Sequence, residues 1–194
     1  MQKKLIFISG TIGSGKTTLS KKIINTIPNS IMLDGDWCFQ QGCDWHFDET
    51  TKQMAIKNII YVLNNFLENP NFETVIFCWT LHRQAMMNQI YNSLNMNNVS
   101  FYHFRLLCSD EVLKERITKR FFDRRSELGI EYNEKDIENM LLGSIKKKSL
   151  YVEDGSIVLD GDANLEQLSE EIIETISQSD KIKVKTVDRN QKKV

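Results

Sequence analysis

The chain has 194 residues, of which 41% are hydrophobic and 26% charged, as in an ordinary globular protein. Its net charge of -1 creates no overall field that would attract nucleic acid or an anionic membrane. Its 9 Gly and 2 Pro exclude a collagen-like or linker-dominated chain, and its apolar runs are too short to span a bilayer. We expect a cytoplasmic protein with one domain over residues 1–178, a flexible basic tail over 179–194, and no nucleic-acid or membrane partner.

The first half of the chain alternates short apolar runs with amphipathic stretches. Residues 5–8 are continuously apolar, which is typical of a strand buried on both faces of a parallel sheet. The spacing of apolar residues predicts helices over about 15–27 and 48–68, with a brief strand over 31–33 between them. The aromatic-rich stretch after that strand has no clean period, and we interpret it as a functional loop.

The same alternation continues in the second half. Strands are predicted over residues 74–79, 101–107 and 156–159, and helices over 84–94, 110–121, 133–150 and 165–176. A basic patch with a glycine, over 119–129, interrupts this series. Strands that alternate with helices indicate an α/β fold with a mainly parallel sheet.

A glycine-rich motif lies between the first strand and the first helix. It reads Gly-Thr-Ile-Gly-Ser-Gly-Lys-Thr over residues 10–17 and matches GxxxxGK[ST] in full, in the context that this motif requires. Backbone N–H groups of such a loop converge on an anion at the helix N-terminus. Lys16 is predicted to reach the β- and γ-phosphates of ATP, and the Thr17 hydroxyl to ligate Mg²⁺. The predicted nucleotide-binding residues are Gly10, Thr11, Ile12, Gly13, Ser14, Gly15, Lys16, Thr17 and Thr18.

With this motif and this order of elements, the chain resembles the P-loop kinases of the nucleoside monophosphate kinase, shikimate kinase, adenylylsulfate kinase and chloramphenicol phosphotransferase type. The likeness covers nearly all of residues 3–178. It implies a P-loop NTPase three-layer sandwich, in which a five-stranded parallel sheet of order 2-3-1-4-5 carries helices on both faces. It also implies a small helical lid over about residues 119–132.

Two carboxylates, Asp34 and Asp36, follow the second strand in an Asp-Gly-Asp triplet that looks like the Asp-x-Asp of shikimate kinases and the Asp-Gly-Asp of adenylylsulfate kinases. The resemblance implies that Asp36 contacts or deprotonates an acceptor hydroxyl and that Asp34 holds Mg²⁺ through water. An Asx turn without a ligand is the structural alternative. Residues 36–71 are the expected acceptor-binding region, whose aromatic side chains either stack on a planar substrate or form the core of a small cap: Trp37, Phe39, Trp45 and Phe47.

The third strand departs from the pattern of many P-loop proteins, because it ends in Cys78-Trp79-Thr80 and has no acidic residue there. In monophosphate kinases an arginine shortly after this strand binds the acceptor phosphate, and Arg83 has the matching position. Those enzymes usually supply a second arginine from the region that corresponds to residues 36–71, which contains none here. This favours a hydroxyl acceptor over a phosphate acceptor.

Basic residues follow the fourth strand. Arg116 and Arg120 are four apart and share one helical face. They resemble the arginines of adenylate kinases that stack over adenine and reach the phosphates. Arg124, or its neighbour Arg125, lies at the position of a lid that closes over the transferring group. A solvated basic helix end is the alternative. The triplet over residues 160–162 falls where the family has its adenine-binding loop, or it is a plain turn.

These residues predict an enzyme, an ATP- and Mg²⁺-dependent kinase that moves the γ-phosphate to a hydroxyl of a small metabolite, nucleoside or antibiotic. The predicted catalytic residues are Lys16, Asp36, Arg120 and Arg124. A nucleoside monophosphate kinase is one alternative, and an ATP-binding regulator without turnover is another. The identity of the acceptor and the choice between a monomer and a dimer stay open.

Overall fold

The computed structural model describes residues 2–41, 48–128, 134–151 and 155–191, and for 124–128 and 179–191 it describes the backbone alone. Strands and helices alternate along the chain, as predicted. The elements are β1 (Lys3–Gly10), α1 (Lys16–Thr26), β2 (Ser30–Asp34), the 3₁₀ helix η1 (Gly35–Phe39), α2 (Glu49–Glu68), β3 (Thr74–Trp79), α3 (Gln84–Tyr91), β4 (Val99–Leu107), α4 (Asp110–Leu128), α5 (Glu134–Lys148), β5 (Ile157–Asp160) and α6 (Leu165–Gln191).

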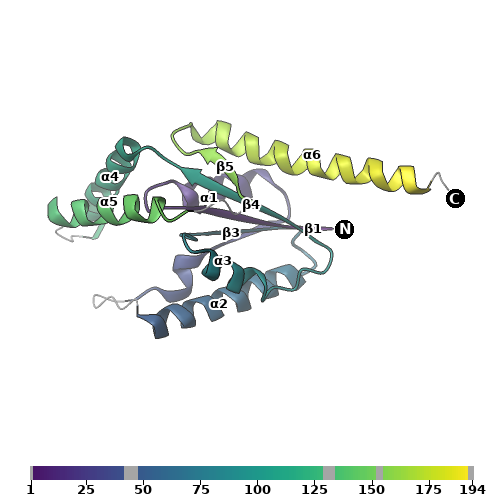
Figure 1. Ribbon diagram of the computed structural model, residues 1–194, viewed down its shortest axis with the longest axis horizontal. Coiled ribbons are helices and arrows are strands. Elements are labelled where there is room, and N and C mark those ends of the chain that lie inside the picture. The colour runs from purple at the N-terminus through teal and green to yellow at the C-terminus, as the bar shows by residue number, and fades with distance from the viewer. Residues whose placement is uncertain (1, 42–47, 129–133, 152–154, 192–194) are drawn as a thin grey trace.

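The five strands form one sheet in the order β2-β3-β1-β4-β5, and all of its pairings are parallel. The fold predicted from the family resemblance is therefore confirmed. Because the strands are parallel, their carboxyl ends lie along one edge of the sheet. Helices α4 and α5 lie beyond that edge (Figure 1). In an open parallel sheet this edge is where ligands bind.

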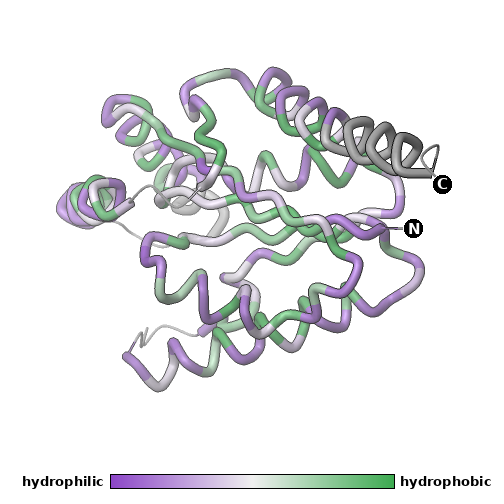
Figure 2. Tube along the Cα trace, turned by 45° about the vertical axis from the view of Figure 1, so that its right-hand side comes forward, coloured by the Kyte–Doolittle hydropathy of each residue, from purple (hydrophilic) through white to green (hydrophobic). Residues whose placement is uncertain are grey.

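The central strand β1 divides its side chains between the two layers of the core. Leu5 and Phe7 pack toward α2 and α3, whereas Ile6 and Ile8 pack toward α1 and α6. All four are completely buried, and each burial stabilises the fold by about 1.5–3 kcal/mol. Figure 2 shows hydrophobic residues along the central strands, with hydrophilic residues alternating along the helices around them. The sheet thus gives the loops at its carboxyl edge a rigid base.

Three boundaries differ from the prediction. The stretch interpreted as a loop begins with the helix η1, whose first turn is closed by the Asp34 side chain accepting a hydrogen bond from Asp36 N at 3.0 Å. Helix α4 runs to Leu128, where the apolar pattern ended it at residue 121, so it continues into the segment expected to form a helical lid. Helix α6 runs to Gln191, where the prediction ended it at residue 176. Neither α4 nor α6 contains Gly or Pro, and polar composition alone does not end a helix.

Within the described part of the chain, no helix is both long enough and apolar enough to cross a bilayer.

Candidate active site

The glycine-rich motif forms the turn between β1 and α1. Gly13 and Gly15 have φ of 84° and 96°, a left-handed conformation that glycine adopts without strain. Gly15 is also the N-cap of α1. A Cβ on Gly13 would lie 2.9 Å from Cγ1 of Ile117, so the loop packs closely against α4. This geometry directs the N-terminus of α1 toward the carboxyl edge of the sheet, where it favours an anion.

Lys16 lies half-buried in the turn, with its Nζ donating a hydrogen bond to the carbonyl of Thr11 at 2.8 Å. Burial lowers the pKa of the Lys16 ammonium group. The carboxylates of Asp36 and Asp34 oppose this shift, and the guanidinium of Arg120 adds to it. The structure therefore brings these four predicted site residues within electrostatic reach of one another.

The Thr17 hydroxyl and the Asp34 carboxylate meet at this site. Thr17 Oγ1 donates a hydrogen bond to Asp34 Oδ2 at 2.6 Å, and Asp34 is buried. A hydroxyl and a carboxylate oxygen are ligands of the kind that Mg²⁺ takes from a protein when phosphates and water supply the others. The pair that the sequence predicted for the metal is thus adjacent, although Thr17 lies in the first turn of α1 and Asp34 at the end of β2, 17 positions apart.

The Asp36 carboxylate is exposed and is oriented by a residue that the sequence did not single out for this site. The indole Nε1 of the buried Trp79 donates to Asp36 Oδ1 at 2.9 Å. Phe39 is buried and packs edge-on against Trp79, with 6.0 Å between ring centroids, so it belongs to the core. Trp37 is 50% exposed and remains the candidate for contact with a substrate. Trp45 and Phe47 lie outside the described residues.

Gly35 permits this arrangement, because the Trp79 ring covers the space where a side chain would stand. A Cβ on Gly35 would lie 2.5 Å from the ring. We expect Gly35→Ala to lower the free energy of unfolding by about 1–3 kcal/mol, the usual cost of overpacking. Urea denaturation followed by tryptophan fluorescence measures this. The control is Gly143→Ala on α5, where an added Cβ would stand in open space. Gly155 is unsuitable as a control, because its φ of 76° would strain any other residue. Equal stabilities for the Gly35 and Gly143 variants would contradict the prediction.

Cys78 lies where many P-loop proteins have an acid, in register with Asp34 on the neighbouring strand. Burial, reinforced by the Asp34 carboxylate, raises the pKa of the Cys78 thiol to about 12. The thiol is therefore neutral at physiological pH. Asp34 supplies the carboxylate at this position instead.

Arg116 lies against the outside of the phosphate loop. Its Nη1 donates to the carbonyl of Ser14 at 3.2 Å and is 3.5 Å from Cys108 Sγ. The second Asp-Gly-Asp triplet closes the same corner, because Asp162 accepts from Ser109 N at 3.0 Å and a Cβ on Gly161 would meet Cys108 Sγ at 2.5 Å. The predicted base-binding residues are thus adjacent.

The remaining arginines differ in position. Arg120 is exposed on α4, and Arg124 follows it one turn later, with its side chain outside the described part of the structure. Arg83 is exposed at the N-cap of α3. The pKa of Glu49 on α2 is lowered mainly by hydrogen bonds from Gln53 and Lys52, and the charge of Arg83 contributes as well. The charge of Arg83 therefore acts on the start of α2, in the expected acceptor region.

A family model described as AAA domain matches residues 6–141 of the chain. The chain belongs to the AAA domain family. The matched residues begin in β1 and end in α5, so they include the phosphate loop and the carboxyl ends of β2 and β3. No curated protein matches the chain.

Solved kinase structures are similar to this chain over nearly its whole length. An unliganded sugar kinase from Janibacter sp. HTCC2649 has a TM-score of 0.66 at 15% identity, covering 91% of this chain and 95% of its own. A gluconokinase from Sinorhizobium meliloti 1021 has 0.61 at 15%, covering 91% and 93%. The Mycobacterium tuberculosis APS kinase in complex with AMPPNP and APS has 0.60 at 13%, covering 91% and 98%. The chain therefore has the fold of the P-loop kinases.

The sequence analysis missed two side chains that shape this site. Trp79 orients Asp36, and Ser144 of α5 donates to the carbonyl of Ile12 in the phosphate loop at 2.8 Å. Trp79 ends a buried strand at the carboxyl edge of the sheet, which is a signal that could have been used. Ser144 is one serine in an amphipathic helix, and nothing in the local pattern distinguishes it.

Proposed function

We propose that the protein is a kinase that transfers the γ-phosphate of ATP to a hydroxyl group of a small-molecule acceptor. The observation that carries this proposal is the hydrogen bond between the phosphate loop and the acceptor-side carboxylates, from Thr17 to Asp34, which in turn accepts from the backbone of Asp36. This chain of contacts connects a phosphate-binding loop with a carboxylate that reaches solvent. Phosphoryl transfer needs both, because the reaction depends on positioning, charge neutralisation and removal of the hydroxyl proton.

Each group has a role in this mechanism. Lys16 and the loop N–H groups bind the β- and γ-phosphates, and Arg120 and Arg124 add positive charge from α4. Thr17 and Asp34 would hold Mg²⁺, which supplies neutralisation of the phosphate charge when it is bound. Asp36, held by the Trp79 indole, accepts the proton as the acceptor oxygen bonds to the γ-phosphorus and the bond to ADP breaks.

The acceptor class rests on the acceptor side of the site. The solvent-exposed carboxylate of Asp36 can take the proton that a hydroxyl acceptor must lose. A phosphate acceptor is already an anionic nucleophile and needs no such base. The absence of Arg from residues 36–71 supports the same choice. The similar structures described as a sugar kinase and a gluconokinase make sugars and sugar acids the first acceptors to test. Arg83, whose charge acts on Glu49 in the acceptor region, supports a nucleoside monophosphate acceptor as the second candidate.

The test is acceptor-dependent formation of ADP by the purified protein. Sugars, sugar acids, nucleosides and nucleoside monophosphates are screened at fixed Mg·ATP, after a thermal-shift screen with a non-hydrolysable ATP analogue selects those that stabilise the protein. We expect at least one hydroxyl acceptor to raise the ADP rate well above the rate without acceptor, and mass spectrometry to find the acceptor with one added phosphate. Phosphorylation of nucleoside monophosphates alone would favour the second candidate. A protein that binds no nucleotide would refute both.

A further inference from the structure

Three carbonyl groups of the phosphate loop accept hydrogen bonds from side chains. The carbonyl of Thr11 accepts from Lys16 Nζ at 2.8 Å, that of Ile12 accepts from Ser144 Oγ at 2.8 Å, and that of Ser14 accepts from Arg116 Nη1 at 3.2 Å. Each donor comes from a different helix, namely α1, α5 and α4. The loop is therefore held from three sides, and α5 holds its middle carbonyl.

The orientation of the Ile12 carbonyl decides where the next N–H points. A peptide unit is planar and trans, so its C=O and N–H point in opposite directions. When Ser144 holds the Ile12 carbonyl toward α5, the N–H of Gly13 is directed away from α5. Gly13 has the left-handed φ that lets successive N–H groups form an anion-binding concavity. The Ser144 hydroxyl thus acts on the peptide that contributes one of those N–H groups.

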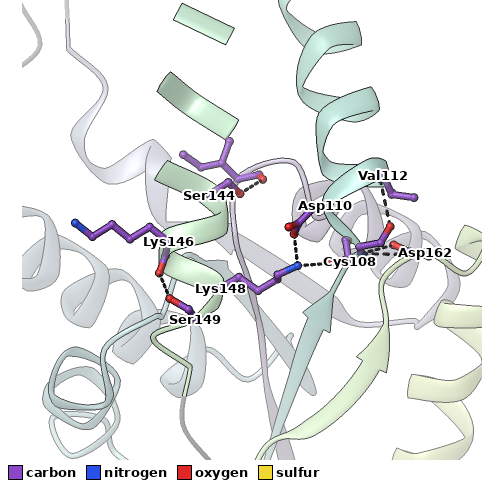
Figure 3. Close-up of polar contacts among 10 residues, drawn as sticks. Cys108, Asp110, Val112, Ser144, Lys146, Lys148, Ser149 and Asp162 are labelled. Atoms are coloured by element: carbon purple, nitrogen blue, oxygen red, sulfur yellow. Dashed lines mark hydrogen bonds and ion pairs between the residues drawn. The ribbon is translucent and has the colours of Figure 1, made fainter. Parts of the chain in front are cut away.

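Ser144 is well placed for this because α5 is itself fixed at its C-terminal end. Ser144 is completely buried. One turn later, Lys148 Nζ donates to the carbonyl of Cys108 at 3.1 Å and pairs with the carboxylate of Asp110 at the start of α4 (Figure 3). Residues four apart lie on one helical face, so both contacts anchor the same side of α5.

We propose that Ser144 is a positioning residue for the nucleotide, whose hydroxyl sets the Ile12–Gly13 peptide so that the Gly13 N–H faces the bound phosphates. This inference rests on the proposed function, because it requires that the loop binds ATP. It assigns to α5, the helix that follows the expected lid, a direct effect on nucleotide affinity.

Two serine-to-alanine substitutions, one in α5 and one just past its end, test this. Ser144→Ala removes the donor to the loop, whereas Ser149→Ala, the matched control, removes a hydroxyl that donates to the carbonyl of Lys146 in the last turn of α5. The dissociation constant of a fluorescent ATP analogue is measured for both, without acceptor. We expect affinity about three- to tenfold weaker for Ser144→Ala, as for the loss of one hydrogen bond, and no change for Ser149→Ala. In turnover, KM for ATP rises by the same factor while kcat and KM for the acceptor stay within twofold.

Thermal unfolding without nucleotide separates positioning from a purely structural role. Ser144→Cys keeps the size of the side chain and has a weaker donor, so its affinity should fall between wild type and Ser144→Ala. Ser144→Ala that loses thermal stability but keeps wild-type ATP affinity would overturn the inference, as would equal losses for Ser144→Ala and Ser149→Ala. If wild type binds no ATP, the proposed function fails first. If wild type binds ATP and Ser144→Ala binds it equally well, only this inference fails.

Discussion

Lys16→Ala is expected to lower ATP-dependent transfer by at least about 10²–10³-fold while the protein stays folded. The side chain belongs to neither layer of the core, and its Nζ bonds a carbonyl of the phosphate loop. It therefore serves the site, where loss of one preorganised donor to the transferring group has an effect of about that size. Burial disfavours the charged form of Lys16 and lowers its pKa. Removing this buried charge should therefore not lower the free energy of unfolding.

The measurement is product formation with the acceptor identified by the screen, together with the thermal unfolding midpoint. Lys22→Ala is the control on the same helix, because Lys22 makes a surface ion pair with Glu166 at 2.7 Å and is remote from the loop contacts. Such a pair contributes little to stability, about 0–1 kcal/mol. Full activity in folded Lys16→Ala protein would refute the kinase proposal.

Asp36→Asn is expected to lower turnover by about 10²–10⁴-fold and to leave ATP affinity nearly unchanged, if Asp36 is the base for an acceptor hydroxyl. The asparagine carbonyl can still accept the hydrogen bond from Trp79 Nε1, so the substitution removes the charge and keeps the position. Asp34→Asn should instead weaken the dependence on Mg²⁺, because Asp34 bonds the Thr17 hydroxyl. Initial rates at saturating acceptor and varied Mg²⁺ distinguish these two effects.

Arg83→Ala decides between the two acceptor classes. A monophosphate acceptor needs no base but does need a charge-assisted contact to its phosphate, worth about 1.5–3 kcal/mol. Its enzyme would therefore suffer more from Arg83→Ala than from Asp36→Asn. The matched control for Asp36→Asn is Asp48→Asn in the acceptor region, because Asp48 caps α2 and asparagine caps a helix equally well. Near wild-type activity for Asp36→Asn, with Arg83→Ala severely impaired, would replace the hydroxyl acceptor by a phosphate.

The phosphate loop and the alternation of strands and helices were predictable because their causes are local. Gly13 and Gly15 adopt left-handed backbone angles that few other residues tolerate, so the motif specifies its own conformation. The apolar run of β1 specifies a strand buried on both faces, since a strand of that composition has to be covered on each side. The strand order had no such local cause and came from the family resemblance, which the structure confirmed.

The ends of α4 and α6 were predicted less well, because they were placed where the apolar pattern stops. A helix can continue through a polar stretch that contains no Gly or Pro, and both helices do so. The two interpretations of the aromatic residues after β2 could not be separated either. The structure assigns Phe39 to the core, where it packs edge-on against Trp79, and leaves Trp37 half exposed.

The amino-acid sequence by itself determined the phosphate-binding loop, the α/β class and the carboxylates that follow β2. Tertiary structure decided what orients them. Trp79 holds Asp36 across 43 positions of the chain, and Ser144 holds the carbonyl of Ile12 across 132. The physical reason is that a backbone conformation or a buried strand requires particular residue types at its own positions. A hydrogen bond between distant elements instead requires only that the fold bring one donor and one acceptor together. No local sequence pattern predicts such a contact.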